Sequence, residues 1–479
     1  MTIANVRRKW LALYVLALGD LLIVLDISIV NVALPSIRED LGFSQASLAW
    51  VINAYTLTFG GFMLLAGRLG DLLGHRRIFL FGVGLFTLAS LACGLATSQE
   101  MLVGARAIQG IGGAIVAAVA LSLIMTLFTE PAERAKAMGV IGFVAAGGGS
   151  IGVLAGGVLT DVLNWHWIFL VNIPIGAAVI ASCLMLLPGD SGERGRAKLD
   201  LAGAVTVTAS LMLAVYAIVN GNEQGWTSAR TLGLLGLAGA GLALFLALES
   251  RVSSPLMPLG LFRLRSIAAS NVVGVLWSAA MFAMFFLSAL YLQLVLGYSP
   301  LKVGLAFLPA NLIMGALSLG LSAKLVLRFG VRLPLVGGMG LVALGLGLFA
   351  RVPVDGNFVV DVLPSMLILG LGIGMAMNPL LLAAMSDVEP QDAGVASGVV
   401  NTSFMLGGAL GLAVLASVAA ARTGDSHSAA ALVDGYQAAF VIGTLFALAA
   451  GAVAGIFLRG GMMPAGDPHA IGEPATELH

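Results

Sequence analysis

Charged residues are scarce in this sequence. Only 10% of its 479 residues are Asp, Glu, Lys or Arg, and 24 cations balance 24 anions. A soluble domain typically carries about a quarter charged residues, so this composition, with a hydrophobic share of 59%, indicates a chain embedded in membrane lipid. Because the net charge is zero, no overall field would attract nucleic acid, and we expect no nucleic-acid partner.

Cysteine is also rare, and histidine is absent from the middle of the long apolar runs. Cys93 and Cys183 both fall within apolar runs and have no metal-ligand spacing, so we interpret them as packing residues and expect no metal site. None of the five histidines falls in the middle of a long apolar run, which disfavours a histidine proton relay. No nucleophile–base pair lies within these runs either, so the sequence does not predict an enzyme.

Long apolar runs are abundant instead. About 20 apolar residues are needed to cross a bilayer, and the sequence contains fourteen such runs. The predicted spans are 11–34, 47–70, 77–97, 101–126, 137–160, 166–187, 200–220, 231–249, 267–296, 302–327, 332–350, 360–384, 394–420 and 437–459. The first run follows Arg7, Arg8 and Lys9 as in a signal peptide, but it continues to Pro35 without a cleavage site, so we interpret it as a retained helix.

The positions of Lys and Arg predict the orientation of the chain. With a cytoplasmic N-terminus, 18 of these 24 residues fall on the cytoplasmic side, five fall outside and one, Arg106, lies within a span. Cytoplasmic loops of membrane proteins carry such an excess of positive charge. We therefore predict an all-α, multi-pass protein of the cytoplasmic membrane, with 14 spans and both termini in the cytoplasm.

An internal repeat predicts the domain organisation. Leu41–Ser44, with the sequence LGFS, returns as LGYS at Leu296–Ser299, and Glu130–Pro131 returns as Glu389–Pro390, each about 255–260 residues later. Equal order and spacing indicate parallel repeats, as in transporters built from two bundles. The predicted domains are a six-helix bundle at 1–188, a linker with an inserted two-helix hairpin at 189–265, a second six-helix bundle at 266–460 and a disordered tail at 461–479.

The stretch GRLGDLLGHRR, residues 67–77, lies between the second and third spans and is interpreted as a tight loop. Gly67 and Gly74 allow a sharp turn and close helix approach. Arg76 and Arg77 mark the cytoplasmic side, and Asp71 is suited to cap a helix N-terminus. A reduced copy at 324–332 keeps the last glycine and the first arginine of the pair but has leucine in place of the aspartate.

Three ionisable residues are predicted to lie deep in the membrane: Asp20, Asp26 and Arg106. Such residues are costly there and are usually functional. A buried carboxylate near a cation can take up and release protons near neutral pH, so Asp26 is the favoured proton carrier, with Arg106 beside it and Asp20 as a competitor. Asp20 lies about 120° around the helix from Asp26. The alternatives are structural hydrogen bonds for either aspartate and an Arg106 side chain that extends to the outer interface.

The fifth span contains Gly148, Gly152 and Gly156, each one helical turn apart. Small residues at this spacing let two membrane helices pack backbone to backbone, either as plain packing or as a seam that slides during a conformational change. Polar and aromatic residues scattered along the spans are candidates to line a substrate cavity. They are Asn31, Asn53, Tyr55, Gln109, Trp277, Tyr291, Asn311, Asn378 and Asn401.

These motifs resemble those of the fourteen-helix drug:proton antiporter branch of the major facilitator superfamily, over nearly the whole chain. Residues 67–77 are similar to the superfamily's loop 2–3 signature, and 106–110 (RAIQG) to its proton-coupling signature. Residues 25–35 resemble the helix 1 signature of this branch, and 167–176 a common opening of helix 6. The resemblance implies a major facilitator fold of two six-helix bundles plus two extra central helices.

The resemblance also implies a function. Proton influx would drive export of small hydrophobic, often cationic drugs or antibiotics by alternating access, with the proton gradient as energy source and no cofactor. We expect the partners to be the substrate, protons and lipid, and the protein to be a monomer. Leu72 and Ser28 depart from the usual arginine and threonine, and Val153 follows Gly152 where antiporters usually have proline. The direction of coupling therefore stays open, as does an endogenous metabolite as substrate.

Overall fold

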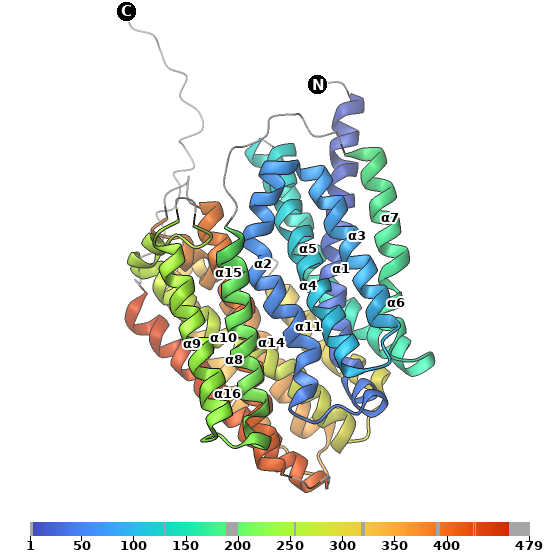
Figure 1. Cartoon of the computed structure of the whole chain (residues 1–479), viewed down its shortest axis with the longest axis vertical. Helices are drawn as coiled ribbons and strands as arrows, with labels where there is room; N and C mark the ends of the chain where they lie inside the picture. The colour runs from blue at the N-terminus through green and yellow to red at the C-terminus, as the bar shows by residue number, and fades with distance from the viewer. Residues whose placement is uncertain are drawn as a thin grey trace, which may run out of the picture.

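The structure is a computed structural model that describes residues 3–128, 130–187, 200–252, 255–317, 321–388, 393–424, 426 and 428–458, with some side chains within these ranges excepted. The described residues form helices and no strand. The tail predicted at 461–479 and the linker at 189–199 lie outside them. Figure 1 shows the helices running side by side through the molecule.

Seven helices of the first half correspond to the first six predicted spans. They are α1 (Ile3–Leu41), α2 (Trp50–Leu73, preceded by the 3₁₀ turn η1 at Ser47–Ala49), α3 (His75–Gly94), α4 (Gln99–Leu127), α5 (Pro131–Val162), α6 (Trp167–Leu170) and α7 (Asn172–Leu186). The sixth span is divided between α6 and α7. Pro174 lies in the first turn of α7, where its missing N–H has no intrahelical partner to lose.

The remaining helices match the other eight predicted spans. The inserted hairpin is α8 (Leu201–Gln224) and α9 (Ala229–Glu249). After the turn η2 (Leu259–Arg263) come α10 (Arg265–Leu290, extended by the π-helical η3 at Tyr291–Val295), α11 (Pro300–Ala316), α12 (Ser322–Phe329), α13 (Arg332–Phe349), α14 (Leu363–Met385, preceded by the π-helical η5 at Phe358–Val362), α15 (Ala393–Thr423) and α16 (Ala429–Phe457).

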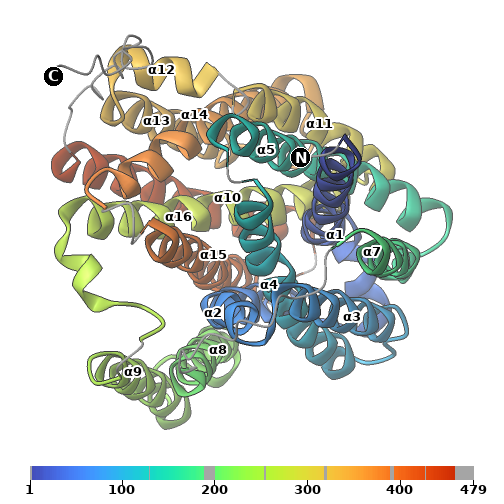
Figure 2. The ribbon, with the colours of Figure 1, turned by 90° about the horizontal axis from the view of Figure 1, so that it is seen from above.

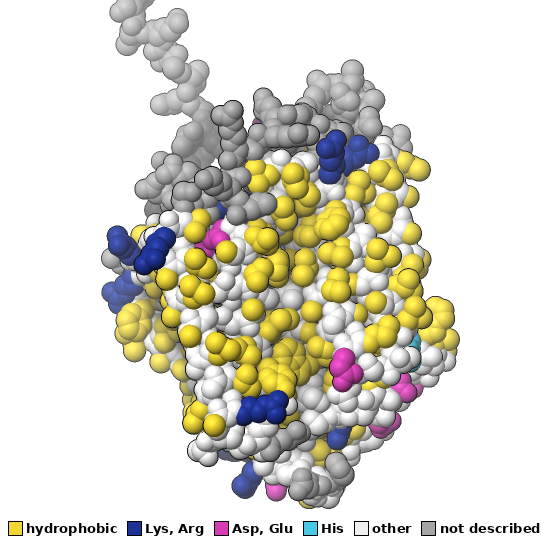
Figure 3. All heavy atoms as spheres, in the orientation of Figure 1, with side chains coloured by type: hydrophobic (Ala, Val, Ile, Leu, Met, Phe, Trp, Pro, Cys, Tyr) yellow, Lys and Arg dark blue, Asp and Glu magenta, His cyan; other side chains and the backbone are white. Residues whose placement is uncertain are grey.

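The length of these helices suits a bilayer. Among the described residues, twelve helices are long and apolar enough to cross a membrane. The other two predicted spans correspond to α5, of 32 residues, and to α11 together with α12. In Figure 3 hydrophobic side chains cover the middle of the visible face, and Lys and Arg lie toward its two ends. An apolar belt between charged ends is the surface that lipid requires.

The helices form two bundles, which contact each other mainly through two pairs of helices. Helices α1–α7 pack among themselves, as do α10–α16, and the two sets touch chiefly through α5 against α11 and through α2 against α15. The hairpin is central in sequence but peripheral in space. Helix α8 packs against α2 and α15, α9 packs against α8, and both lie at the edge of the molecule in Figure 2.

Repeated glycines have positive φ at matching places in both halves. Gly42 and its counterpart Gly297 have φ of +70° and +65°, and Gly74 and its counterpart Gly330 have φ of +100° and +71°. Only glycine adopts such φ values without a steric penalty. The sequence echoes around these positions therefore mark equivalent helix ends.

Candidate functional site

A buried ion pair lies in the core of the first bundle. Asp26 on α1 is 0% exposed and Arg106 on α4 is 1% exposed. Arg106 Nη1 donates to Asp26 Oδ2 over 2.5 Å. An isolated charge at this depth would be very costly, and its partner offsets that cost. The structure therefore joins the two residues across the bundle, and Arg106 does not extend to the interface.

Asp26 accepts two further hydrogen bonds. Its Oδ1 accepts from Gln109 Nε2 on α4 over 2.7 Å and from Asn172 Nδ2 on α7 over 3.1 Å. The same two amides also donate to Ser90 Oγ on α3, each over 2.8 Å. Gln109, which the sequence predicts to line the substrate cavity, belongs to this network instead. Sequence reasoning missed Asn172 and Ser90, although Asn172 is the only strongly polar residue of the 167–176 motif.

Arg106 is held by more than its carboxylate partner. Its Nε donates to the carbonyl of Val51 over 2.9 Å, and its Nη1 also donates to Gln109 Oε1 over 2.7 Å. The guanidinium carbon lies 4.3 Å from the ring centroid of Tyr55 and 5.6 Å from that of Phe169. Aromatic faces stabilise a desolvated cation. These contacts would keep Arg106 in place if Asp26 became neutral.

Asp20 lies apart from this network. It sits six residues before Asp26 on α1 and is only partly buried. It makes no hydrogen bond or ion pair with any residue that the structure describes. The two aspartates therefore differ sharply: Asp26 is fully buried and paired with a cation, whereas Asp20 is neither.

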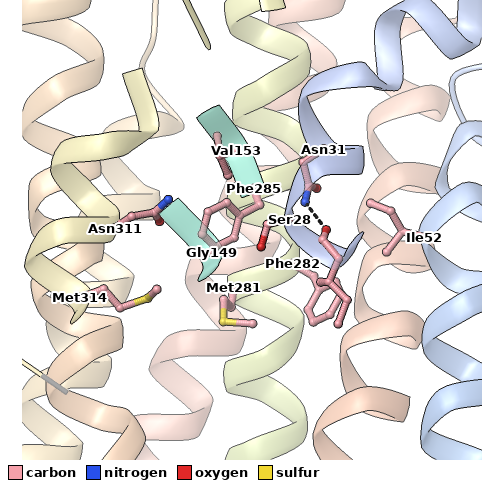
Figure 4. Close-up of a pocket in the computed structure, with 11 residues that line it drawn as sticks. Ser28, Asn31, Ile52, Gly149, Val153, Met281, Phe282, Phe285, Asn311 and Met314 are labelled. Carbon is pink, nitrogen blue, oxygen red and sulfur yellow. Dashed lines mark hydrogen bonds between the residues drawn. The ribbon is translucent and has the colours of Figure 1, made fainter. Parts of the chain in front are cut away.

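A cavity of about 180 Å³ lies between the two bundles. Figure 4 shows the residues that line it, which belong to α1, α2, α5, α10 and α11. They are Ile27, Ser28, Asn31, Ile52, Gly149, Val153, Met281, Phe282, Phe285, Asn311 and Met314. Pockets for drug-sized ligands measure roughly 300–1,000 Å³, so this cavity is smaller than the usual site for such a ligand.

Helix α1 serves both the ion pair and the cavity. Ser28 and Asn31 follow Asp26 by two and five residues, which places them about 200° and 140° around the helix from it. Asp26 faces the bundle core, whereas Ser28 and Asn31 face the cavity. Both cavity residues donate to carbonyls of their own helix, Ser28 Oγ to Val24 O over 2.8 Å and Asn31 Nδ2 to Ile27 O over 3.1 Å.

Two of the nine predicted cavity residues, Asn31 and Asn311, line this cavity. The other seven do not: Asn53, Tyr55, Gln109, Trp277, Tyr291, Asn378 and Asn401. Tyr291 donates instead to the carbonyl of Pro353 over 2.8 Å, and Asn401 to that of Ser397 over 3.0 Å. Most of the lining is apolar, aromatic or methionine. The signal that could have found it is the run MFAMFF at 281–286.

The three glycines of α5 face α1. A Cβ at Gly148 would lie 3.0 Å from atoms of Leu21 and Val24, and one at Gly152 would lie 3.1 Å from the carbonyl oxygen of Leu25. At Gly156 it would lie 2.6 Å from the carbonyl oxygen of Ile29. Spacing of this kind brings two helix backbones together. Helix α5 therefore packs closely against the helix that carries Asp26 and the cavity residues.

Comparison with known proteins shows to which family this chain belongs. The sequence profile of the Major Facilitator Superfamily matches residues 16–412. The chain belongs to this superfamily. It is 41% identical over 448 residues to the puromycin resistance protein of Streptomyces alboniger, covering 92% of this chain and 89% of that protein. It is 40% identical over 442 residues to the cephamycin export protein of Amycolatopsis lactamdurans, covering 91% and 90%.

Two further likenesses concern the family and the fold. The lincomycin resistance protein of Streptomyces lincolnensis is 38% identical over 422 residues, which cover 87% of this chain and 85% of that one. The crystal structure of the nucleoside transporter NupG superposes with a TM-score of 0.67 at 14% identity, covering 93% of this chain and 98% of that one. At that identity the structural match shows the fold alone. The chain is thus a multi-pass transporter of the major facilitator fold.

The superfamily's loop 2–3 signature is mostly helical in this chain. We predicted a loop over 67–77, but α2 continues to Leu73 and α3 begins at His75, so the turn is confined to Gly74. The apolar Leu69, Leu72 and Leu73 extend α2, and Gly74 ends it with φ of +100°. Arg76 Nη2 donates to the carbonyl of Leu184 on α7 over 2.7 Å.

The other residues of this signature are Gly67, Asp71 and Arg77. Gly67 has open packing, because a Cβ there would meet only Ala118 on α4, at 3.9 Å. Arg77 lies at the surface beside Leu73 and Phe81. Asp71 belongs to α2, but its side chain lies outside the described residues, so the predicted capping role stays a prediction.

We expect Gly74→Ala to destabilise the protein, because a side chain at this φ costs about 1–3 kcal/mol. Thermal unfolding in detergent measures the loss. Gly84→Ala is the matched control, since within the described part of the chain a Cβ at Gly84 in α3 meets no atom within 4 Å. The control should be neutral or slightly stabilising, because alanine favours a helix over glycine. Equal melting temperatures for the two variants would show that the turn tolerates a side chain.

Proposed function

We propose that this chain exports hydrophobic, including cationic, drugs or antibiotics across the cytoplasmic membrane in exchange for protons, by alternating access. The observation that carries the proposal is the buried Asp26–Arg106 ion pair on a helix that also lines the inter-bundle cavity. The resistance and export functions named for its relatives support the substrate class. No cofactor is needed, because the proton gradient supplies the energy.

Protonation of Asp26 would change how α1 is held. A neutral carboxyl group no longer attracts Arg106 as an ion, and it accepts hydrogen bonds from Gln109 and Asn172 less strongly. Arg106 keeps its contacts to Val51 and Tyr55. The link between α1 and α4 is thereby weakened, while α4 itself stays ordered.

A shift of α1 would reach the cavity directly. Ser28 and Asn31 move with the helix that carries Asp26, and the glycine seam of α5 offers no side chains to block sliding. Proton binding and substrate binding are therefore coupled through one rigid element. Asp20, closer to the predicted cytoplasmic end of α1, is assigned a secondary role in moving the proton.

The cavity lining favours apolar cargo. Ser28, Asn31 and Asn311 supply its polar side chains, and Met281, Met314 and two phenylalanines supply most of the remainder. Methionine adapts to irregular shapes, which suits a site that accepts several hydrophobic compounds. Three hydroxyl or amide groups are few for a sugar-like solute, which would need more hydrogen-bond partners.

The proposed topology follows from the positive charges. Both termini lie in the cytoplasm. The proposal also holds that the bundles at 1–188 and 266–460 move relative to each other, that the segment 189–265 carries the inserted hairpin, and that the protein works as a monomer. The excess of Lys and Arg on one side supports this orientation, and the paucity of contacts between bundles other than α5–α11 and α2–α15 is compatible with their movement.

Transport assays in everted membrane vesicles test the function. Puromycin and lincomycin are suitable probes, given the names of the relatives. We expect uphill uptake of at least one probe when a pH gradient is imposed, and loss of that uptake when an ionophore collapses the gradient. Uptake that persists without the gradient would exclude proton coupling. Failure of every hydrophobic probe, with uptake of a polar metabolite, would favour the alternative substrate class.

A further inference from the structure

Two carboxyl side chains lie buried at the ends of the inserted hairpin. Asp200 immediately precedes α8, and its Oδ1 accepts from the backbone N–H of Gly203 over 2.7 Å, as an N-cap does. Glu249 is the last residue of α9, and its Oε2 accepts from the backbone N–H of Met257 over 2.9 Å. The two residues are 4% and 3% exposed. In each carboxyl group, one oxygen thus accepts a hydrogen bond.

The other two oxygens face the same small space. Asp200 Oδ2 and Glu249 Oε1 are both buried, and neither accepts a hydrogen bond from a residue that the structure describes. They lie 2.6 and 2.7 Å from the position that a Cβ on Gly203 would occupy, and the two side chains are within hydrogen-bonding reach of each other. If both groups were ionised, two negative oxygens would face each other with no donor between them. A buried acceptor left in that way costs about 1–3 kcal/mol, and more when it is charged.

Among the described residues, a cation on a neighbouring helix faces the pair. Arg68 on α2 is near enough to attract Glu249 electrostatically, and its guanidinium donates to the carbonyl of Pro255 in the segment after α9. Arg251, two residues after Glu249, is exposed to solvent. Arg68 therefore stabilises one negative charge at this place, while Asp200 Oδ2 and Glu249 Oε1 accept no hydrogen bond from the part of the chain that the structure describes.

We propose that Asp200 and Glu249 form a second proton-binding site, in which one proton is held between Asp200 Oδ2 and Glu249 Oε1. A single O–H donor satisfies both oxygens at once. The pair then carries one negative charge instead of two, and Arg68 balances it. Closely spaced carboxyl groups elsewhere share a proton for the same reason, because two like charges a few ångströms apart cannot both ionise.

The shared proton would hold the two ends of the hairpin together. The shared proton links the first turn of α8 to the last residue of α9, beside the 255–257 segment that Arg68 of α2 also holds. Loss of the proton would loosen the base of the hairpin from the first bundle, near the α2–α3 turn. The proposal does not depend on proton coupling at Asp26, so either could fail alone.

Amide substitutions test the site, because an amide mimics the protonated group. In Glu249→Gln the amide oxygen can accept from Met257 and the amide nitrogen can donate to Asp200; Asp200→Asn offers the reciprocal arrangement. We expect the wild-type melting temperature in detergent to fall by several degrees between about pH 6 and pH 9, because the stabilising proton is present at low pH and lost as pH rises. Each amide variant should keep its donor and lose most of this fall.

The control is Glu39→Gln, which replaces an exposed acid on α1 and should melt with the wild-type pH profile. Parallel profiles for the wild type and both amide variants would overturn the proposal.

If those variants do not fold, infrared spectroscopy of Asp26→Asn protein provides a second measurement. A protonated-carboxyl band that disappears as pH rises, and is present in Asp20→Asn/Asp26→Asn protein as well, supports the site. Absence of such a band at all pH values refutes it.

Discussion

Asp26→Asn is expected to abolish proton-driven uphill efflux, with export at least tenfold below wild type. Asparagine mimics the permanently protonated carboxyl group, so the cycle of proton uptake and release stops. Binding should survive for a neutral drug and weaken for a cationic one, because the site loses a negative charge. The measurement is substrate-induced proton release from purified protein in detergent, combined with uphill transport in vesicles.

The same substitution should also lower stability. It leaves Arg106 buried at 1% exposure without its counter-charge, and removing one partner of a buried ion pair typically costs about 3–5 kcal/mol. The contacts of Arg106 to Val51 O, Gln109 and the ring of Tyr55 reduce that loss. A second variant, Asp26→Glu, keeps the charge. It should recover part of the stability and some proton release, which separates loss of function from loss of folding.

Asp20→Asn is the matched control on the same helix. Asp20 is only partly buried and is not joined to Arg106, so its replacement should change stability little and transport less than Asp26→Asn does. If Asp26→Asn released protons as wild type does and Asp20→Asn did not, the roles of the two aspartates would be exchanged.

Gly152→Leu is expected to cause the second large effect. A Cβ at Gly152 would lie 2.8 Å from Ser28 Cβ and 3.1 Å from the carbonyl oxygen of Leu25, so even the first carbon of the side chain meets α1. Overpacking of this kind costs about 1–3 kcal/mol. It would also displace the part of α1 that carries Asp26 and Ser28. We therefore expect transport to be lost and the melting temperature to fall, as measured by vesicle uptake and thermal unfolding.

Alanine variants separate packing from helix propensity. Gly152→Ala and Gly147→Ala gain the same propensity within α5, roughly 0.5–1 kcal/mol in favour of alanine. A Cβ at Gly147 meets no atom of the described residues within 4 Å. Gly147→Ala should thus be neutral or stabilising with full transport, whereas Gly152→Ala should be less stable and slower. Similar behaviour of the two would show that the α1–α5 seam is not tightly packed at Gly152.

Most of the membrane-spanning helices could be predicted from the sequence because bilayer thickness sets the length of an apolar run, and a backbone within lipid must satisfy its own hydrogen bonds. The turn at Gly74 could be predicted for a related reason, since a positive φ strongly favours glycine, and the reduced copy at 324–332 pointed to its counterpart Gly330. Asp26 and Arg106 stood out because buried charge is rare. Those features depend on local chemistry alone.

The partners of these residues depended on tertiary structure. Hydropathy does not encode how a membrane helix is rotated or tilted; packing against its neighbours decides that. Rotation of α4 turned Gln109 toward Asp26 and away from the cavity, and the start of α7 brought Asn172 to the same carboxylate. Asp200 and Glu249, 49 positions apart in sequence, became neighbours only because α8 and α9 pack antiparallel at the edge of the bundles. Charge and length can be read along one chain, whereas a contact needs the relative orientation of two helices.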